Sequence, residues 1–300
     1  MAQIVWELLT AAYLFLAGLG AGSYIISAIA DIKGKGKYEG MARFGAHLSW
    51  PLVALGLILL ILHMGRPELN NPVHILGIFT NYSSSMLSIE ALLMGGVIVV
   101  GAATSFFWLA KWKRVWLRMV IEIIGSIIAF VAIISSGLVL TLSSGISFWE
   151  SPFLTWVFTV SSMLSALALV GLTETHLGSL LFPRFNIKPE VATLKTLTLY
   201  SSSTIIVEII TMALFLAHTY ITGNATEGIS ILTTGSLSLI FWSMLGLGLI
   251  LPLLLGYMIT RRAKSLSTET SVKILSLITF VCLIAGGFLL RYTILYAGQL

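Results

Sequence analysis

Long apolar segments separated by short polar ones follow one another along the whole chain. A helix needs about 20 apolar residues to cross the hydrocarbon core of a membrane. Eight segments are long enough and carry few charges, so we expect eight membrane-spanning helices. They are residues 4–30, 45–64, 84–110, 117–142, 152–182, 196–221, 232–259 and 271–297. The pattern therefore predicts an all-α integral membrane protein, with its first segment retained.

Lysine and arginine are concentrated in four of the connections between these segments. Of the 17 basic residues, 15 follow the first, third, fifth or seventh segment, and only Arg66 and Arg291 fall toward the other side. Basic loops next to membrane helices remain in the cytoplasm. We therefore expect a multi-pass protein of the cytoplasmic membrane with both termini outside.

Composition supports the same class. Hydrophobic residues make up 57% of the chain and charged residues 10%, against about 25% charged in soluble domains. Cys282 is the one cysteine, which excludes a disulfide within the chain, an all-cysteine metal site and c-type haem attachment. The net charge of +5 arises in the basic loops, so it does not indicate nucleic acid. We expect neither metal nor haem in this chain.

The connections are too short to hold a soluble domain. We therefore treat residues 1–300 as one domain. Its halves, about 1–145 and 146–300, each contain four segments and begin on the same side. This predicts two four-helix bundles.

Several ionisable residues lie inside the apolar segments, where a charge costs about 2.5–3.5 kcal/mol on insertion scales. Glu122 is close enough to a segment end to be interfacial, whereas Glu208 falls near mid-membrane. In the segment 196–221, a set of mostly polar residues recurs at sequence spacings of three and four, which places its members on one face of a helix: Ser201, Thr204, Glu208, Thr211, Phe215 and His218. This face is either a proton-conducting stripe or a polar packing seam. Glu174 and His176 either form its cytoplasmic mouth or face a loop.

The first segment and the outer connections supply further candidates. Thr10 and Tyr13 are either ordinary interfacial residues or hydrogen-bond donors to a bound carbonyl. Gly18 and Gly22, with Ala17 and Ala21 beside them, form a small-residue face suited to close helix packing. Arg66 stands on a side poor in basic residues, where it either caps a helix end or docks an acidic partner.

Several motifs, in order along the chain, resemble the NrfD / polysulfide reductase membrane-subunit family nearly end to end. They are Trp6-Glu7, the run 13–22 from Tyr13 to Gly22, Gly65-Arg66-Pro67, Ser85-Met86-Leu87-Ser88, Ser136-Gly137, Phe148-Trp149-Glu150-Ser151-Pro152, the run 286–292 from Gly286 to Tyr292, and Ala297-Gly298-Gln299. Each piece is weak alone, but their order and spacing over eight apolar segments are specific.

The resemblance implies a quinone- or quinol-binding membrane anchor of a multi-subunit respiratory oxidoreductase, with menaquinone the favoured quinone. It implies an extracytoplasmic, ferredoxin-like iron–sulfur subunit that passes electrons to a molybdopterin or multihaem catalytic subunit. It also places the quinone near the outer face of the first bundle. Membrane lipid is the other expected partner, and proton translocation is a further expectation.

In the polysulfide reductase member, an Asn and a His of the first segment and a Tyr of the fourth line the quinone site. The first two positions fall here on Thr10 and Tyr13, and the third falls near Ser135 or Ser136. This chain departs from the family pattern at all three.

A quinone head group needs hydrogen-bond donors at its oxygens and a group that exchanges protons. Thr10, Tyr13, Glu90 and Ser136 are the candidate head-group contacts, with His63 or His218 for proton exchange. The candidate proton pathway runs from Glu174 and His176 through Thr204, Glu208 and Thr211 to His218, and Arg66 is the candidate docking residue.

Two other classes remain open at this point. A b-type cytochrome needs histidine pairs that face each other across neighbouring helices. A proton-coupled secondary transporter favours matched helices interrupted by Gly or Pro. Pro252 interrupts the seventh segment, but the third has no clear counterpart.

Overall fold

The computed structural model describes residues 8–34, 36–64, 85–110, 115–143, 145–175, 190–223, 226–261 and 269–300. Within these residues there is no β-strand, and eight helical segments are long and apolar enough to cross a membrane. This confirms the predicted fold class. The helices are α1 (Leu8–Gly34), α2 (Glu39–Met64), α4 (Met86–Leu109), α5 (Val115–Thr141), α6 (Pro152–Gly171), α8 (Val191–Thr222), α9 (Thr226–Thr233), α10 (Ser238–Ser243), α11 (Leu251–Arg261) and α12 (Glu269–Ala297).

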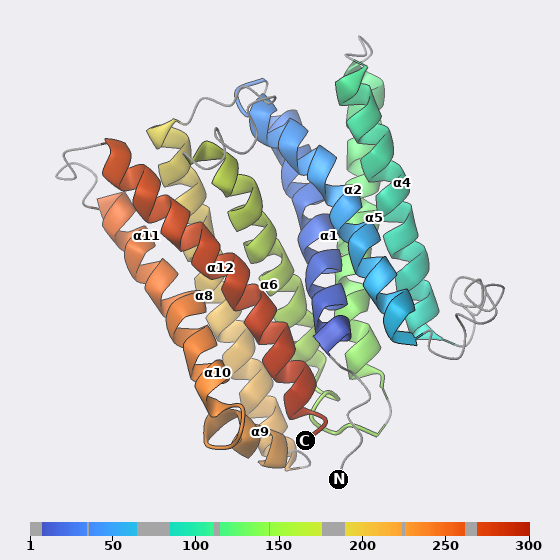
Figure 1. Ribbon diagram of the computed structural model, residues 1–300, viewed down its shortest axis with the longest axis vertical. Coiled ribbons are helices and arrows are strands. Elements are labelled where there is room, and N and C mark those ends of the chain that lie inside the picture. Colours follow the sequence, from blue (N-terminus) through green and yellow to red (C-terminus); the bar gives the residue numbers. More distant parts are fainter. Residues whose placement is uncertain are drawn as a thin grey trace.

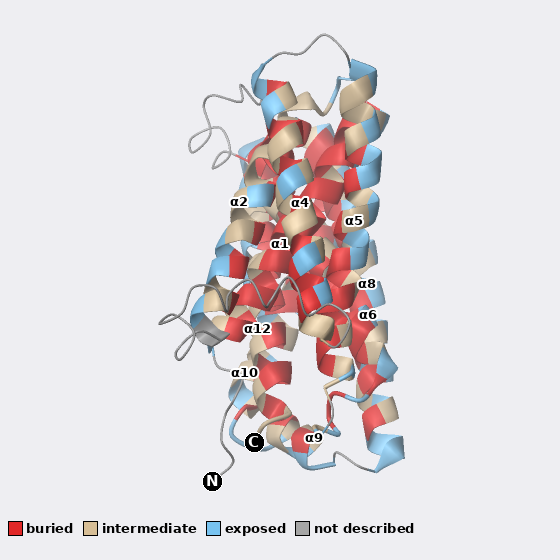
Figure 2. Cartoon of the chain, turned by 90° about the vertical axis from the view of Figure 1, so that its right-hand side faces the viewer, coloured by how far each residue is buried: buried red, intermediate tan, exposed pale blue. Residues whose placement is uncertain are grey.

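The long helices form two groups of four that lie side by side (Figure 1). The first group contains α1, α2, α4 and α5, and the second contains α6, α8, α12 and the segment built from α10 and α11. They meet where α6 packs against α1 and α5, and where α12 packs against α1. Buried residues fill the interior, while the membrane-facing sides expose residues such as Val99 and Ile127 (Figure 2). Exposed aliphatic side chains on these sides suit contact with lipid tails.

Small residues of α1 let it approach both groups closely. A Cβ added at Gly20 falls 2.6 Å from the Ser49 carbonyl oxygen of α2. On another side of the helix, a Cβ at Gly22 falls 2.7 Å from the Ala166 Cβ of α6, and one at Gly18 meets Ser162. The structure thus agrees with the packing role expected for Gly18 and Gly22, and adds Gly20.

The seventh segment is less regular than predicted. The expected helix 232–259 is broken, because α9 ends at Thr233 and α10 begins only at Ser238. A π-helical stretch, Met244–Ile250, then joins α10 to α11. In this stretch a Cβ at Gly248 falls 2.7 Å from the Gly286 Cα of α12. The predicted segment 152–182 also differs, because α6 and a short 3₁₀ turn end at Glu174 and residues 176–189 lie outside the described part.

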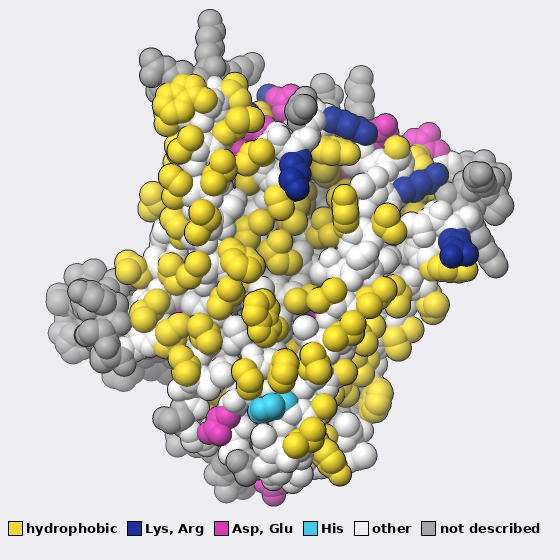
Figure 3. Space-filling model, turned by 180° about the vertical axis from the view of Figure 1, so that it is seen from behind, with side chains coloured by type: hydrophobic (Ala, Val, Ile, Leu, Met, Phe, Trp, Pro, Cys, Tyr) yellow, Lys and Arg dark blue, Asp and Glu magenta, His cyan; other side chains and the backbone are white. Residues whose placement is uncertain are grey.

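The two ends of the molecule differ in charge. We call the end at which α1 begins and α12 finishes the terminal end, and the opposite one the basic end (Figure 1). Seven of the described Lys and Arg residues lie toward the basic end: Lys33, Lys37, Arg43, Arg118, Lys195, Arg261 and Lys273. Figure 3 shows Lys and Arg in the upper part of one face and His below, toward the terminal end.

Candidate functional site

A buried polar cluster joins three helices of the first group near the terminal end. Tyr13 comes from the second turn of α1, Glu90 from the start of α4, and Ser136 from near the end of α5. Because α1 and α4 begin at this end and α5 finishes there, their polar residues meet at one depth. The Ser136 hydroxyl donates a hydrogen bond of 2.5 Å to Glu90 Oε1. Tyr13, Glu90 and Ser136 are each at most 4% exposed.

Several polar atoms of this cluster are left unmatched. The Thr10 hydroxyl, the Tyr13 hydroxyl and Glu90 Oε2 are buried and make no hydrogen bond of good geometry to a described residue, although the Tyr13 hydroxyl and the Glu90 carboxylate interact weakly with each other. The Glu90 carboxylate is close enough for its charge to act on the Tyr13 hydroxyl. Buried polar groups are normally hydrogen-bonded, so unmatched ones need a reason. The Tyr13 hydroxyl beside the Glu90 carboxylate, with the Thr10 hydroxyl about one turn earlier on α1, matches a ligand that carries both oxygen acceptors and hydroxyl donors.

The structure distinguishes the two serines of α5. The Ser135 hydroxyl donates to the Ala132 carbonyl oxygen at 2.8 Å, whereas Ser136 faces Glu90. Ser136 is therefore the one that joins the cluster. His63 lies in the last turn of α2, but its side chain is outside the described part, as is Arg66.

A second buried cluster contains Arg291, which the sequence pattern had assigned only to the outer side. Arg291 of α12 is 1% exposed and donates to Ser162 Oγ at 2.6 Å and to the Gly287 carbonyl oxygen at 2.8 Å. A longer contact of 3.3 Å joins it to Ser161 Oγ. Glu208 of α8 is 2% exposed, interacts with Ser161, and lies within electrostatic reach of Arg291.

The proximity of Arg291 to Glu208 could have been predicted from the sequence. Arg291 is a charge inside the apolar segment 271–297, and charges within a membrane pair with one another. The mid-membrane carboxylate of Glu208 was the natural partner. The sequence pattern used Arg291 only to assign the outer side of the membrane, so its proximity to Glu208 was not predicted.

The polar stripe of α8 is only partly buried. Its buried face carries Ser201, Glu208 and Phe215, and the Ser201 hydroxyl has no partner among the described residues. Thr204 donates to the Tyr200 carbonyl oxygen at 2.9 Å, and Thr211 donates to that of Glu208 at 3.0 Å. Both threonines are half-buried at the edges of this face. Thr204 also lines an apolar membrane-facing groove of about 350 Å³.

Glu174 and His218, which were expected at the two ends of the stripe, lie near opposite ends of α8. Glu174 is 6% exposed and accepts a hydrogen bond of 3.4 Å from the Glu190 backbone N–H, just before α8 begins. This contact ties the end of α6 to the start of α8. His176 lies outside the described residues. His218 lies near the other end of α8, with its ring edge toward Phe153 at 5.7 Å between centroids.

A third cluster, at the basic end, was not expected. Arg118 of α5 donates two hydrogen bonds to the Asp31 carboxylate, at 2.9 and 3.0 Å, and stacks over Trp108 at 3.7 Å. Glu122 lies 3.7 Å from Arg118 and is 1% exposed. Glu122 thus lies toward the beginning of α5, and its side chain faces Arg118 and Asp31 inside the protein. The cluster ties the ends of α1, α4 and α5 together.

No group of three or more potential metal ligands occurs among the residues that the structure describes. His47 and His218, the two histidines with described side chains, lie toward opposite ends of the molecule. They therefore do not form a facing pair.

Comparison with known proteins adds two findings. The profile of the family described as "Polysulphide reductase, NrfD" matches residues 1–300. The C subunit of the polysulfide reductase of Wolinella succinogenes is 30% identical over 320 aligned residues. The alignment covers 99% of the present sequence and 95% of that relative.

Proposed function

Because the chain belongs to the NrfD polysulphide reductase family over its whole length, we propose that it is the quinone-reactive membrane subunit of a multi-subunit respiratory oxidoreductase. The relative is named as one lettered component of a reductase, which supports a role as one subunit among several. The partners are an extracytoplasmic ferredoxin-like iron–sulfur subunit and a molybdopterin or multihaem catalytic subunit.

The observation that carries this proposal is the unmatched polar cluster of Thr10, Tyr13, Glu90 and Ser136. A quinol supplies two electrons and two protons when it is oxidised. The Thr10 hydroxyl can donate a hydrogen bond to a ring oxygen, and so can the Tyr13 hydroxyl, whose interaction with Glu90 is not a well-formed hydrogen bond. Glu90 Oε2 can accept a proton, because it makes no well-formed hydrogen bond in the described part of the protein. Ser136 holds the other carboxylate oxygen and so fixes the orientation of Glu90.

The orientation follows from the charged ends. The basic end belongs in the cytoplasm by the positive-inside rule, so the quinone site lies toward the outer face. Electrons leave there to the iron–sulfur subunit, and protons from the quinol leave on the same side. Oxidation at this site alone therefore moves no charge across the membrane.

A separate proton route through the second helix group would couple the redox reaction to charge movement. Glu208 is its central group, held among Ser161 and Arg291. Glu174 and His176 form the cytoplasmic entry and His218 the outer exit, with Thr204 and Thr211 along the helix between them. The buried hydroxyl of Ser201 lies on the same face as Glu208, two turns toward the basic end.

The test is purification of the native complex through a tag on this chain, followed by quinol oxidation assays with a menaquinol analogue. We expect an iron–sulfur subunit to co-purify and quinol-dependent reduction of its clusters. Glu90→Gln, which keeps the shape of the side chain but cannot take up a proton, should lower the rate at least about tenfold. A complex without iron–sulfur protein would overturn the proposal.

A further inference from the structure

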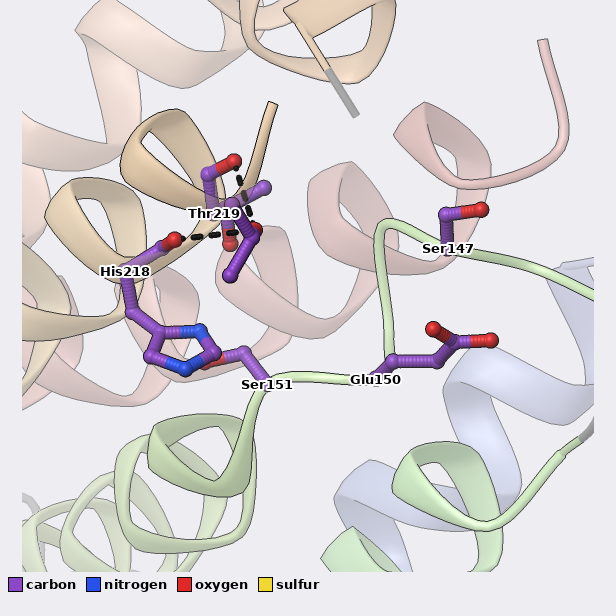
Figure 4. Close-up of a pocket in the computed structure, with 6 residues that line it drawn as sticks. Ser147, Glu150, Ser151, His218 and Thr219 are labelled. Carbon is purple, nitrogen blue, oxygen red and sulfur yellow. Dashed lines mark hydrogen bonds between the residues drawn. The ribbon is translucent and has the colours of Figure 1, made fainter. Parts of the chain in front are cut away.

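A small polar pocket opens at the terminal end of the second helix group. It has a volume of about 100 Å³ and is lined by Ser147, Glu150, Ser151, His218, Thr219 and Thr222. The first three belong to the connection between α5 and α6, and the others to the last turns of α8 (Figure 4). In this view Ser151 is directed at the His218 ring, while Glu150 and Ser147 lie farther along the loop.

The pocket contains polar groups that nothing in the described part of the protein satisfies. Ser151 is 3% exposed, and its hydroxyl has no hydrogen-bond partner among the described residues. His218 Nδ1 is buried and equally without a partner there. Unmatched buried groups at a surface opening indicate that something else completes them.

The polar groups that line the pocket mainly offer hydrogen-bond acceptors. The Thr219 and Thr222 hydroxyls donate to backbone carbonyls of α8 and so present only lone pairs to the pocket. The exposed carboxylate of Glu150 adds a negative charge at the opening. An acceptor-rich, negatively charged pocket suits a cationic donor such as an ammonium or guanidinium group.

The loop that carries these groups is held rigidly. Trp149 is fully buried and donates from its indole N–H to the Ile294 carbonyl oxygen of α12 at 3.1 Å. Phe148 is 3% exposed and packs edge-on against Phe215 of α8, at 5.3 Å between centroids. These two anchors fix Glu150 and Ser151 relative to α8, so the pocket exists before anything binds.

The charge around the pocket identifies the source of the cation. Among the described residues, the terminal end exposes Glu150 and Glu227 but no lysine or arginine side chain. A basic surface of a docked protein complements this face. The volume accommodates the end of one long basic side chain. The pocket also opens at the same end of the molecule at which the proposed electron-accepting subunit docks.

We propose that this pocket receives a lysine or arginine side chain of the subunit that docks on the outer face, and so fixes how that subunit sits. The inference rests on the proposed function, because it needs an outer subunit. Glu150 neutralises the cation at the opening, and Ser151 and His218 complete its hydrogen bonds deeper in the pocket.

The test measures how much outer subunit co-purifies with the tagged protein, over a series of salt concentrations. Glu150→Lys should lower the retained subunit about tenfold or more, and Glu150→Gln should shift its loss to lower salt. Ser151→Ala should weaken retention without lowering the amount of protein in the membrane. Glu227→Lys is the comparison variant, because Glu227 is an acidic residue of the same end outside the pocket, and it should lower the retained subunit far less than Glu150→Lys does.

A second measurement does not depend on these variants. A photo-crosslinking amino acid at Ser147 should join this protein to the outer subunit. Two outcomes would overturn the proposed role of the pocket while leaving the proposed function intact. One is unchanged retention of the outer subunit in Glu150→Lys, and the other is a complex that yields no cross-link from position 147. A wild-type protein that purifies with no outer subunit would instead overturn the proposed function, and the pocket with it.

Discussion

Two tyrosines of α1 show how burial alone fails to identify a ligand contact. Tyr13 and Tyr24 are each 1% exposed. The Tyr24 hydroxyl is satisfied, since it lies 3.0 Å from Thr104 Oγ1 and 3.2 Å from the Ile121 carbonyl oxygen. The Tyr13 hydroxyl makes no hydrogen bond of good geometry to a described residue. The Tyr24 hydroxyl is therefore fully satisfied within the protein, whereas the Tyr13 hydroxyl, which interacts only weakly with Glu90, can still donate to a ligand.

Tyr13→Phe should accordingly lower kcat/KM for quinol about tenfold, the effect of losing one hydrogen bond of roughly 1–1.5 kcal/mol to the substrate. Tyr24→Phe, the matched control, should leave quinol kinetics unchanged and lower thermal stability slightly. Steady-state assays of both purified complexes check this. Equal kinetics for Tyr13→Phe and wild type would remove Tyr13 from the site.

Glu208 and Glu122 provide a similar contrast among buried carboxylates. Glu208 lies beside Ser161 and Arg291 in the second helix group, whereas Glu122 belongs to the Arg118 cluster of the first. We expect Glu208→Gln to abolish proton translocation while quinol oxidation stays largely intact, because amide groups do not carry the proton. Glu122→Gln should keep the wild-type proton-to-electron ratio. Complexes in liposomes measure both, and an unchanged ratio in Glu208→Gln would refute the pathway.

Arg291 also predicts a stability effect. Replacing it with Met removes its hydrogen bonds to Ser162 and Gly287 and also the charge that acts on Glu208, a loss of about 1.5–3 kcal/mol. The double variant Arg291→Met/Glu208→Gln also removes the carboxylate and should recover the electrostatic part of that loss. Thermal unfolding in detergent compares the two. If the double variant unfolds as early as the single one, the charges are not energetically coupled.

At the level of helices, close packing of α1 depends on glycines that face neighbours. A Cβ at Gly20 meets the backbone of α2, which cannot move aside cheaply, whereas a Cβ at Gly95 of α4 meets nothing within 4 Å. Gly20→Ala should destabilise the protein by about 1–3 kcal/mol through overpacking. Gly95→Ala should be neutral or stabilising by up to about 1 kcal/mol. Thermal unfolding of the two variants separates packing from helix propensity, and equal stability would contradict the packing role.

The helices that the sequence could predict are those defined by length and hydropathy alone. The break before Ser238 could not be predicted, because the residues around Gly235 carry no charge and so do not interrupt an apolar segment. Nor could hydropathy show which helices are neighbours, and so the Arg118 cluster was missed. The candidate contacts Tyr13, Glu90 and Ser136 were predicted, but their meeting in one cluster depends on how α1, α4 and α5 pack. Whether they bind quinone stays a prediction.

For the whole molecule, the function requires the terminal end to face outward, and this orientation can be tested directly. In a Cys282→Ser background, single cysteines at Glu227 and Lys37 mark the two ends, since both positions are exposed. A membrane-impermeant thiol reagent added to intact cells should label position 227 and leave position 37 unlabelled until the membrane is opened. The reverse pattern would place the Tyr13 cluster on the cytoplasmic side. Quinol protons would then be released inside, and an outer iron–sulfur subunit would have no electron donor within reach.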